Sequence, residues 1–283
     1  MKGVTAIIIA RQGSSRLPGK AMIEIMGKPV LSIIIERLKN IPEVKKICVA
    51  TSNLDIDKPI LQIAKKEGIM SFAGHPNDVL DRLYYAAKLC NAEIIYEVGG
   101  DCPLVDRDTL NKAILLMEKR NYDFVHNFAP MTYPDGLDCP LMTFDCLEQT
   151  HNNAVLSSHR MHPFSYIFSN SEQFSIGSFT SSQNYGHFRL TLDYEEDLVL
   201  LRKIFERLYS EDPKFTLEDV IQLLDENPSL VQINSQYVLP PSPEAYWNTL
   251  AYIDDLHDDL AKLVITSKET GKNQNFALAV KQY

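Results

Sequence analysis

Continuous runs of apolar, β-branched residues alternate along the chain with segments in which apolar residues recur at helical spacing. The first run, residues 4–10 (VTAIIIA), is typical of a central strand that is covered on both faces of a parallel sheet. After Pro29, apolar residues recur three and four positions apart as far as Leu38, which predicts a helix ending near Asn40. The chain therefore begins with a predicted strand, loop and helix.

The same alternation continues beyond this first unit. Further strands are predicted at residues 46–51, 93–98, 122–127 and 188–193. Further helices are predicted at residues 57–68, 77–90 and 194–209, and after Asp106, which can cap a helix. Strands that alternate with helices form parallel crossover units, so we expect an α/β fold with a doubly wound, mostly parallel sheet of Rossmann-like type.

Two stretches depart from this alternation. Residues 129–187 contain turn signals, short strands and a Ser/Asn-rich segment, and we interpret them as a mid-chain insertion or an arm that contacts a second copy of the chain. The consecutive prolines in residues 240–243 (PPSP) predict the end of the compact unit, because proline ends helices and favours extended backbone. We therefore expect one domain, residues 1–239, followed by a helical C-terminal appendage, residues 240–283.

Charge and cysteine content narrow the possible functions. The formal net charge of −9 argues against a general affinity for nucleic acid or for an anionic membrane. The five cysteines are odd in number and never form a C-x-x-C pair, which favours free thiols in a cytoplasmic protein. The apolar run at residues 4–10 is too short to span a membrane. Residues 1–23 are an exception to the overall charge, because they contain four basic residues and no acid, which suits a compact anionic ligand.

The first candidate binding segment is the loop that follows the first predicted strand. Ligands of open α/β sheets bind beyond the carboxyl ends of the strands, which is where residues 11–20 lie. Its glycines allow backbone N–H groups to approach phosphate oxygens, Arg11 and Arg16 can bind those oxygens with two donors each, and Lys20 supplies a point charge. The loop is not a Walker A motif, because Pro18 replaces the second glycine. The alternative is a surface turn with solvated charges.

Two distant aspartates are candidates for binding a metal ion. Asp101 follows the predicted strand 93–98, and Asp193 ends the predicted strand 188–193, so both can face the same crevice as the basic loop. Mg²⁺ prefers one or two carboxylates together with substrate phosphates and water. Taken alone, Asp101 could belong to an ordinary turn. The acids at residues 195–197 are explained as complements to a helix dipole. The combination of the loop with both aspartates predicts a site for Mg²⁺ and a triphosphate.

Five motifs, in order, resemble those of the CMP-KDO synthetases and acylneuraminate cytidylyltransferases, and above all their relative, the spore coat polysaccharide biosynthesis protein F family. The resemblance spans residues 5–208. The first motif is A-R-x-x-S-x-R-L-P-G-K, which begins at Ala10 and is followed by residues 27–29. The other four motifs are residues 78–82 (DVLDR), 100–104 (GDCPL), 133–138 (YPDGLD) and 192–198 (LDYEEDL).

The resemblance implies a nucleotidyltransferase fold and a distribution of roles. It implies catalytic contacts to the triphosphate from Arg11, Arg16 and Lys20, and a nucleotide site completed by Ala10, Gly13, Ser14, Asp78, Arg82 and Gly100. It implies Mg²⁺ ligands at Asp101 and Asp193, and acceptor contacts from Asp135, Asp138, His162 and Arg189. Gly99 stands where KDO synthetases carry glutamine, which leaves the identity of the acceptor open.

We therefore expect an enzyme that transfers CMP from CTP to an acidic sugar and releases pyrophosphate, in the synthesis of a surface polysaccharide or glycoconjugate. We expect it to use Mg²⁺ and to be a cytoplasmic homodimer with no nucleic-acid or membrane partner. One alternative is a nucleotidyltransferase that uses a phosphorylated or phosphonate acceptor, or another nucleoside triphosphate. A second alternative is a non-catalytic nucleotide-binding scaffold.

Overall fold

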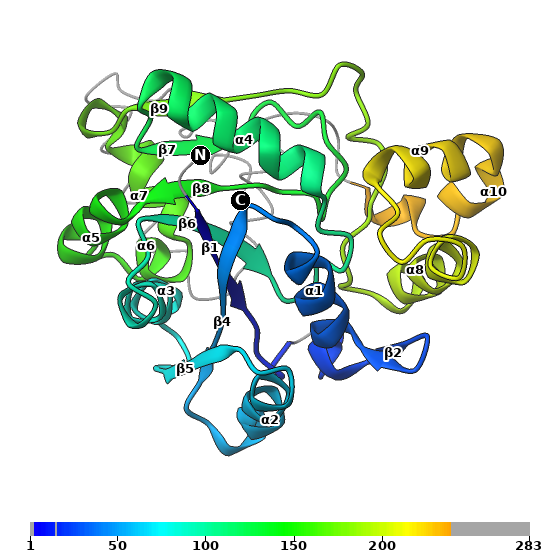
Figure 1. Cartoon of the computed structure of the whole chain (residues 1–283), viewed down its shortest axis with the longest axis horizontal. Helices are drawn as coiled ribbons and strands as arrows, with labels where there is room; N and C mark the ends of the chain where they lie inside the picture. The colour runs from blue at the N-terminus through cyan, green and yellow to red at the C-terminus, as the bar shows by residue number, and fades with distance from the viewer. Residues whose placement is uncertain (1–2, 15, 239–283) are drawn as a thin grey trace.

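A seven-stranded sheet runs through the centre of the computed structural model, which describes residues 3–14 and 16–238 (Figure 1). The order of its strands is β5-β4-β1-β6-β8-β7-β9. The strands are β1 (Val4–Ile9), β4 (Val44–Ser52), β5 (Met70–Gly74), β6 (Ile94–Gly99), β7 (Phe124–His126), β8 (Leu141–Thr143) and β9 (Ile176–Ser178). A separate two-stranded sheet contains β2 (Glu24–Ile25) and β3 (Lys28–Pro29). The predicted appendage at residues 240–283 lies outside the described residues.

The direction of the strands confirms the expected doubly wound α/β class. Strands β5, β4, β1 and β6 pair in parallel, and only β8 runs antiparallel to its two neighbours, β6 and β7. The chain passes from β1 to β4 and β5 on one side and then returns to β6 on the other side of β1. This reversal creates a switch point between β1 and β6, the place where such sheets bind ligands.

Helices cover both faces of the sheet. The helices are α1 (Val30–Lys39), α2 (Lys58–Lys66), α3 (Val79–Leu89), α4 (Arg107–Arg120), α5 (Phe144–Asn153), α6 (Ser157–Met161), α7 (Pro163–Ser169), α8 (Glu195–Leu208), α9 (Leu217–Glu226) and α10 (Pro228–Val231). Short 3-10 turns are η1 (Lys20–Met22), η2 (Asp55–Asp57), η3 (Ser171–Gln173) and η4 (Ser235–Tyr237). None of the helices in the described part of the chain is long and apolar enough to cross a membrane.

The hydrophobic core is divided by the sheet into two clusters. Because side chains alternate along a strand, Ala6 and Ile8 of β1 enter one cluster and Ile7 enters the other. Helices α1, α2, α4, α8 and α9 pack into the first cluster, and α3, α5 and α7 pack into the second. Figure 1 shows α8, α9 and α10 together at one side of the molecule and α3, α5, α6 and α7 at the opposite side.

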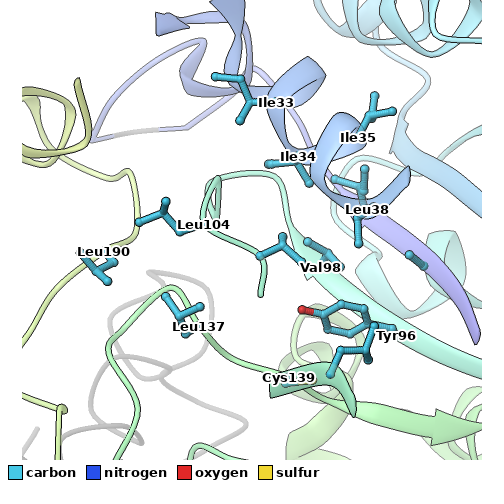
Figure 2. Close-up of a cluster of buried hydrophobic side chains, with 14 of the residues drawn as sticks. Ile33, Ile34, Ile35, Leu38, Tyr96, Val98, Leu104, Leu137, Cys139 and Leu190 are labelled. Atoms are coloured by element: carbon cyan, nitrogen blue, oxygen red, sulfur yellow. The ribbon is translucent and has the colours of Figure 1, made fainter. Parts of the chain in front are cut away.

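The first cluster also anchors the loops beyond the strand ends. Figure 2 shows Tyr96 and Val98 of β6 among the α1 side chains, with Leu104, Leu137 and Leu190 close by. These three leucines are buried, and each belongs to a different segment that follows the strands. Burial of one leucine in each loop therefore fixes the position of that loop against the core.

The prediction of a strand at residues 188–193 is wrong. This segment makes a single isolated bridge, between Arg189 and Asp135. Its backbone hydrogen bonds go to loops instead of a strand ladder: the Leu190 N–H donates to the Asp135 carbonyl at 2.7 Å, and the Leu192 N–H donates to the Asp101 carbonyl at 2.9 Å. The segment thereby ties together the two motifs that contain Asp101 and Asp135.

Residues 129–187 contribute directly to the central sheet. Strand β8 lies between β6 and β7, and β9 forms the edge next to β7. Helices α5 and α6 of the same stretch contact α3. Whether this stretch also contacts a second copy of the chain stays a prediction, as does the division into domain and appendage.

Candidate active site

The loops after β1 and β6 meet at the switch point of the sheet. The Gly100 N–H donates to the Ile9 carbonyl at 2.9 Å. A Cβ atom at position 100 would lie 2.7 Å from the Ala10 Cβ and 2.9 Å from the Ile9 oxygen, closer than real contacts allow. Glycine is therefore required here for the two loops to touch, and the structure brings Ala10 and Gly100 together.

Lys20 joins the basic loop to both predicted metal-binding aspartates. Its Nζ atom donates to Asp101 Oδ2, and it also donates to Asp193 Oδ1 at 2.7 Å. Arg16 Nη2 donates to the second oxygen of Asp193 at 3.0 Å. Four residues that span 177 positions of the sequence thus converge at one edge of the sheet.

The surroundings keep this cluster charged. Burial by itself would lower the pKa of Lys20, but the carboxylates of Asp101 and Asp193 outweigh that effect and raise it. Burial would raise the pKa of Asp193, yet Lys20, Arg16 and Arg189 together lower it. The site therefore holds charges of both signs, and Lys20 and Arg16 would exchange these carboxylate partners for phosphate oxygens when an anionic ligand binds.

A buried ion-pair network positions Asp193. Arg189 Nη2 donates to Asp193 at 3.2 Å, Nη1 donates to Asp135 at 2.6 Å, and Nε donates to Asp197 at 3.0 Å. Asp197 also accepts a bond of 2.9 Å from the Asp193 N–H and one of 2.8 Å from Asn234 Nδ2. Our interpretation of Asp197 as a simple complement to the helix dipole was incomplete, because its side chain is fully buried within this network.

A cavity of about 240 Å³ opens beside this cluster. Six acids are among the residues that line it: Glu97, Asp101, Asp106, Asp135, Asp138 and Asp193. No lysine, arginine or histidine is among the described residues that line it. The predicted acceptor residues Asp135 and Asp138 therefore share one cavity with the predicted metal ligands.

Two of these acids have pKa values well above the ordinary values of carboxyl groups. Burial, reinforced by the negative charges of Asp135 and Asp101, raises the pKa of Asp138 to about 8. Burial raises the pKa of Glu97 to about 7, with Arg82 acting in the opposite direction. Both carboxyl groups can therefore exchange protons near neutral pH.

The remaining predicted residues form a second, neighbouring group. Burial, reinforced by the positive charge of Arg11, lowers the pKa of His162 to about 4 and also lowers the pKa of Arg82, so Arg11 is close enough to each of them for its charge to act. Arg82 Nη1 donates to the carbonyls of His75 and Pro76 at 2.6 and 2.8 Å.

Asp78 and Ser14, which we predicted to bind the nucleotide, already form hydrogen bonds within the protein. Asp78 caps α3 through the Asp81 N–H at 2.8 Å and pairs with Arg160 at 2.8 Å. The Ser14 N–H donates to the Gln12 carbonyl at 2.9 Å, whereas Gly13 is exposed and a Cβ atom there would meet open space. Gly13 is therefore the more accessible of the two loop positions that we predicted to approach phosphate.

Sequence reasoning missed four residues that shape the site. These are Glu97, Arg160, Asp197 and Asn234. Glu97 carried a usable signal, because an acid in the middle of an otherwise apolar strand needs an explanation. The partners of Asn234 and Arg160 depend on contacts across 37 and 82 positions, respectively, which no local pattern reveals.

A doubly wound sheet with a cationic loop opposite two carboxylates at its switch point defines a nucleotidyltransferase. A model of the cytidylyltransferase family matches residues 5–235, and the chain belongs to this family.

Three known proteins are similar to this chain. A solved cytidylyltransferase from Leptospira borgpetersenii is 31% identical, with a TM-score of 0.77, and the match covers 82% of this chain and 98% of that one. The spore coat polysaccharide biosynthesis protein SpsF of Bacillus subtilis is 24% identical over 81% of this chain and 96% of its own length. The 3-deoxy-manno-octulosonate cytidylyltransferase of Trichlorobacter lovleyi is 40% identical, but only over 39% of this chain and 43% of its own length.

Proposed function

We propose that the protein transfers CMP from CTP to a sugar acid and releases pyrophosphate. The observation that carries this proposal is the convergence of Arg16, Lys20, Asp101 and Asp193 beside a cavity large enough for a small acceptor. The names of two relatives, a polysaccharide biosynthesis protein and a sugar-acid cytidylyltransferase, support the choice of acceptor class. By the same reasoning we propose a role in the synthesis of a surface polysaccharide or glycoconjugate, by a cytoplasmic homodimer.

In this reaction the protein acts mainly by positioning and by neutralising charge. An acceptor hydroxyl oxygen forms a bond to the α-phosphorus of CTP, the bond between the α-phosphorus and the bridging oxygen breaks, and the proton of the hydroxyl passes to solvent. Arg16 and Lys20 bind the triphosphate and neutralise the charge that develops on the departing pyrophosphate. Arg11 extends this cationic surface toward Arg82, where we place the cytidine.

The donor set at the site fits Mg²⁺. Asp101 and Asp193 direct carboxylate oxygens at one cationic atom, Lys20 Nζ, so two hard oxygen ligands already converge on one point. We propose that these two aspartates hold the ion. When bound, Mg²⁺ would polarise the α-phosphate and neutralise the phosphate charge.

The acceptor residues that we predicted have different accessibility. Asp135 and Asp138 line the cavity and can accept hydrogen bonds from sugar hydroxyls. Arg189 is only 6% exposed, and its donors bind Asp135, Asp193 and Asp197, so we propose that it acts on the acceptor by positioning Asp135. The charge of Arg11 acts on His162, and we propose that His162 contacts the acceptor where it meets the nucleotide.

The test is a screen for pyrophosphate release in which each of CTP, UTP, GTP and ATP is combined with sugar acids, sugar phosphates and phosphonates. We expect release with CTP and a sugar acid, and mass spectrometry should show the CMP adduct. Release only with a sugar phosphate or with another nucleotide would overturn the proposed specificity. Specific CTP binding without turnover on any acceptor would favour the non-catalytic alternative.

A further inference from the structure

We propose that the ring of Tyr194, supported by the ring of Tyr237, positions Arg16 for binding the triphosphate. The inference rests on the proposed function, because it concerns how this arginine is presented to the same nucleotide. It adds two aromatic side chains to the ionic groups at the switch point of the sheet, and both act as positioning residues.

Arg16 is a long side chain at an exposed position of the basic loop. The side chain is 43% exposed, its Nη2 atom donates to Asp193 at 3.0 Å, and its Cζ atom lies 5.5 Å from the centre of the Tyr194 ring. A guanidinium group within about 6 Å of an aromatic ring centre is attracted by the ring. When a phosphate oxygen takes the place of Asp193, the ring is a contact that Arg16 can keep.

The position of the Tyr194 ring is fixed from two directions. Tyr194 caps the N-terminus of α8, and its N–H donates to the buried carboxylate of Asp197 at 3.0 Å, which holds the backbone. The ring of Tyr237 stacks on it, with 3.8 Å between the ring centres and 3° between the planes. The stack resists rotation of the Tyr194 side chain, because rotation would break the contact between the two ring faces.

Tyr237 is itself anchored by the short 3-10 turn η4, to which it belongs. The hydroxyl group of Tyr237 and the Nε2 atom of Gln236 each donate to Glu196, at 3.2 Å in both cases. Asn234, directly before η4, donates from Nδ2 to Asp197 at 2.8 Å. The turn η4 is thereby fastened to the first turn of α8, where the two rings stack.

Tyr194 also lies close to a second arginine. The Cζ atom of Arg189 is 5.4 Å from the centre of the ring. Arg189 is buried, however, and three carboxylates already fix its guanidinium group. Arg16 is therefore the partner whose position the ring can decide, because an exposed arginine otherwise samples many rotamers.

A guanidinium group that is held in place contributes more to catalysis than a mobile one. Arg16 neutralises the charge that develops on the departing pyrophosphate, and such a group acts most strongly when its orientation is set before the charge forms. The aromatic ring of Tyr194, rather than its hydroxyl group, supplies this orientation. A phenylalanine at position 194 would therefore serve, whereas an aliphatic side chain would not.

A double-mutant cycle between Tyr194 and Arg16 tests the proposal. The readout is the Kd of pyrophosphate in the presence of Mg²⁺, measured by isothermal titration calorimetry, because this ligand reports on the cationic site without an acceptor. Tyr194→Leu should raise this Kd about tenfold, as expected for the loss of a cation–π contact that is partly shielded from water. In the Arg16→Ala background, the same substitution should change the Kd by no more than about twofold.

Further variants separate a role of the ring from a general effect on the fold. Tyr194→Phe keeps the ring and should restore most of the affinity that Tyr194→Leu loses. Tyr237→Leu removes the support and should raise the Kd about threefold, again only when Arg16 is present. Thermal unfolding checks each variant, and Tyr237→Leu takes the place of Tyr194→Leu in the cycle if the latter does not fold. Tyr85→Leu, at an exposed tyrosine on α3, is the matched control and should leave the Kd unchanged.

The outcomes distinguish this inference from the proposed function. The inference is overturned, while the proposed function stands, if Tyr194→Leu binds pyrophosphate as the wild type does, or if it weakens binding equally with and without Arg16. Equal losses in Tyr194→Phe and Tyr194→Leu would also overturn it. If the wild-type protein binds neither CTP nor pyrophosphate, the proposed function is overturned and this inference with it.

Discussion

Asp193 and Asp138 are the same residue type, line the same cavity and meet opposite electrostatic surroundings. Asp193 has three cationic partners, which lower its pKa despite burial. Burial, reinforced by the negative charges of Asp135 and Asp101, raises the pKa of Asp138 to about 8. The comparison teaches that burial raises the pKa of a carboxyl group unless cationic partners in the fold outweigh it, so the same residue type can serve as a fixed charge or as a group that exchanges protons.

The largest expected effect comes from Asp101. Asp101→Asn changes one of the two aspartates that we propose hold Mg²⁺, and we expect kcat/KM for pyrophosphate release to fall on the order of 10³ or more, because metal coordination contributes several kcal/mol to stabilising the transition state. Asp138→Asn should cost no more than about tenfold with a sugar acid, since it keeps one hydrogen-bonding oxygen. Steady-state kinetics on both variants, with Asp225→Asn at an exposed position of α9 as control, measures the contrast. Equal losses in the two variants would contradict the difference in role between Asp101 and Asp138.

A smaller effect is expected from Arg16. Arg16→Ala should lower kcat on the order of 10²–10³, comparable to the loss of a single electrostatic donor. The thermal stability of this variant should hardly change, because the Arg16 side chain is 43% exposed and its ion pair with Asp193 contributes about 0–1 kcal/mol. Single-turnover kinetics and thermal unfolding test the two statements. The matched control is Arg120→Ala at the exposed end of α4. A loss of only a few-fold in kcat would place Arg16 outside the reacting centre.

The smallest effect concerns stability and pH. The pKa of Asp138 is about 8 in the folded chain, above the ordinary value of about 3.9 that it would have when unfolded. The stabilising contribution of its proton is therefore complete below pH 4 and is lost as the pH rises to 8. Asparagine does not titrate, so Asp138→Asn should become more stable relative to the wild type, by roughly 2 kcal/mol, between pH 5 and pH 6.5. Urea unfolding at the two pH values measures this difference, and a difference that does not change with pH would contradict the assignment.

The convergence of the reactive groups could be predicted because it follows from topology. Parallel strands place their carboxyl ends at one edge, so a basic loop after one strand and Asp101 after another were expected to meet. Asp193 was placed correctly for a partly wrong reason, because its segment is not a strand. Apolar and polar residues alternate there as in a strand, but the backbone hydrogen bonds go to the loops at Asp101 and Asp135.

The electrostatic difference between Asp193 and Asp138 could not be predicted. It depends on which cation reaches which acid, and the partners of Asp135 and Asp193 lie 54 and 177 positions away, at Arg189 and Arg16. Strand β8 was missed for a related reason, since three residues are too few to show a period and its place in the sheet depends on pairing with β6. Local patterns indicate elements, whereas the charge state of a site is set by contacts between distant ones.

The contact of Gly100 with Ile9 and Ala10 has a consequence for engineering. Because the two loops touch without room for a methyl group, neither can be redesigned independently of the other. A library that varies the loop after β1 to change nucleotide choice should keep glycine at position 100 and a small residue at position 10. Variants that ignore this coupling would displace Asp101 before any change in specificity could be observed.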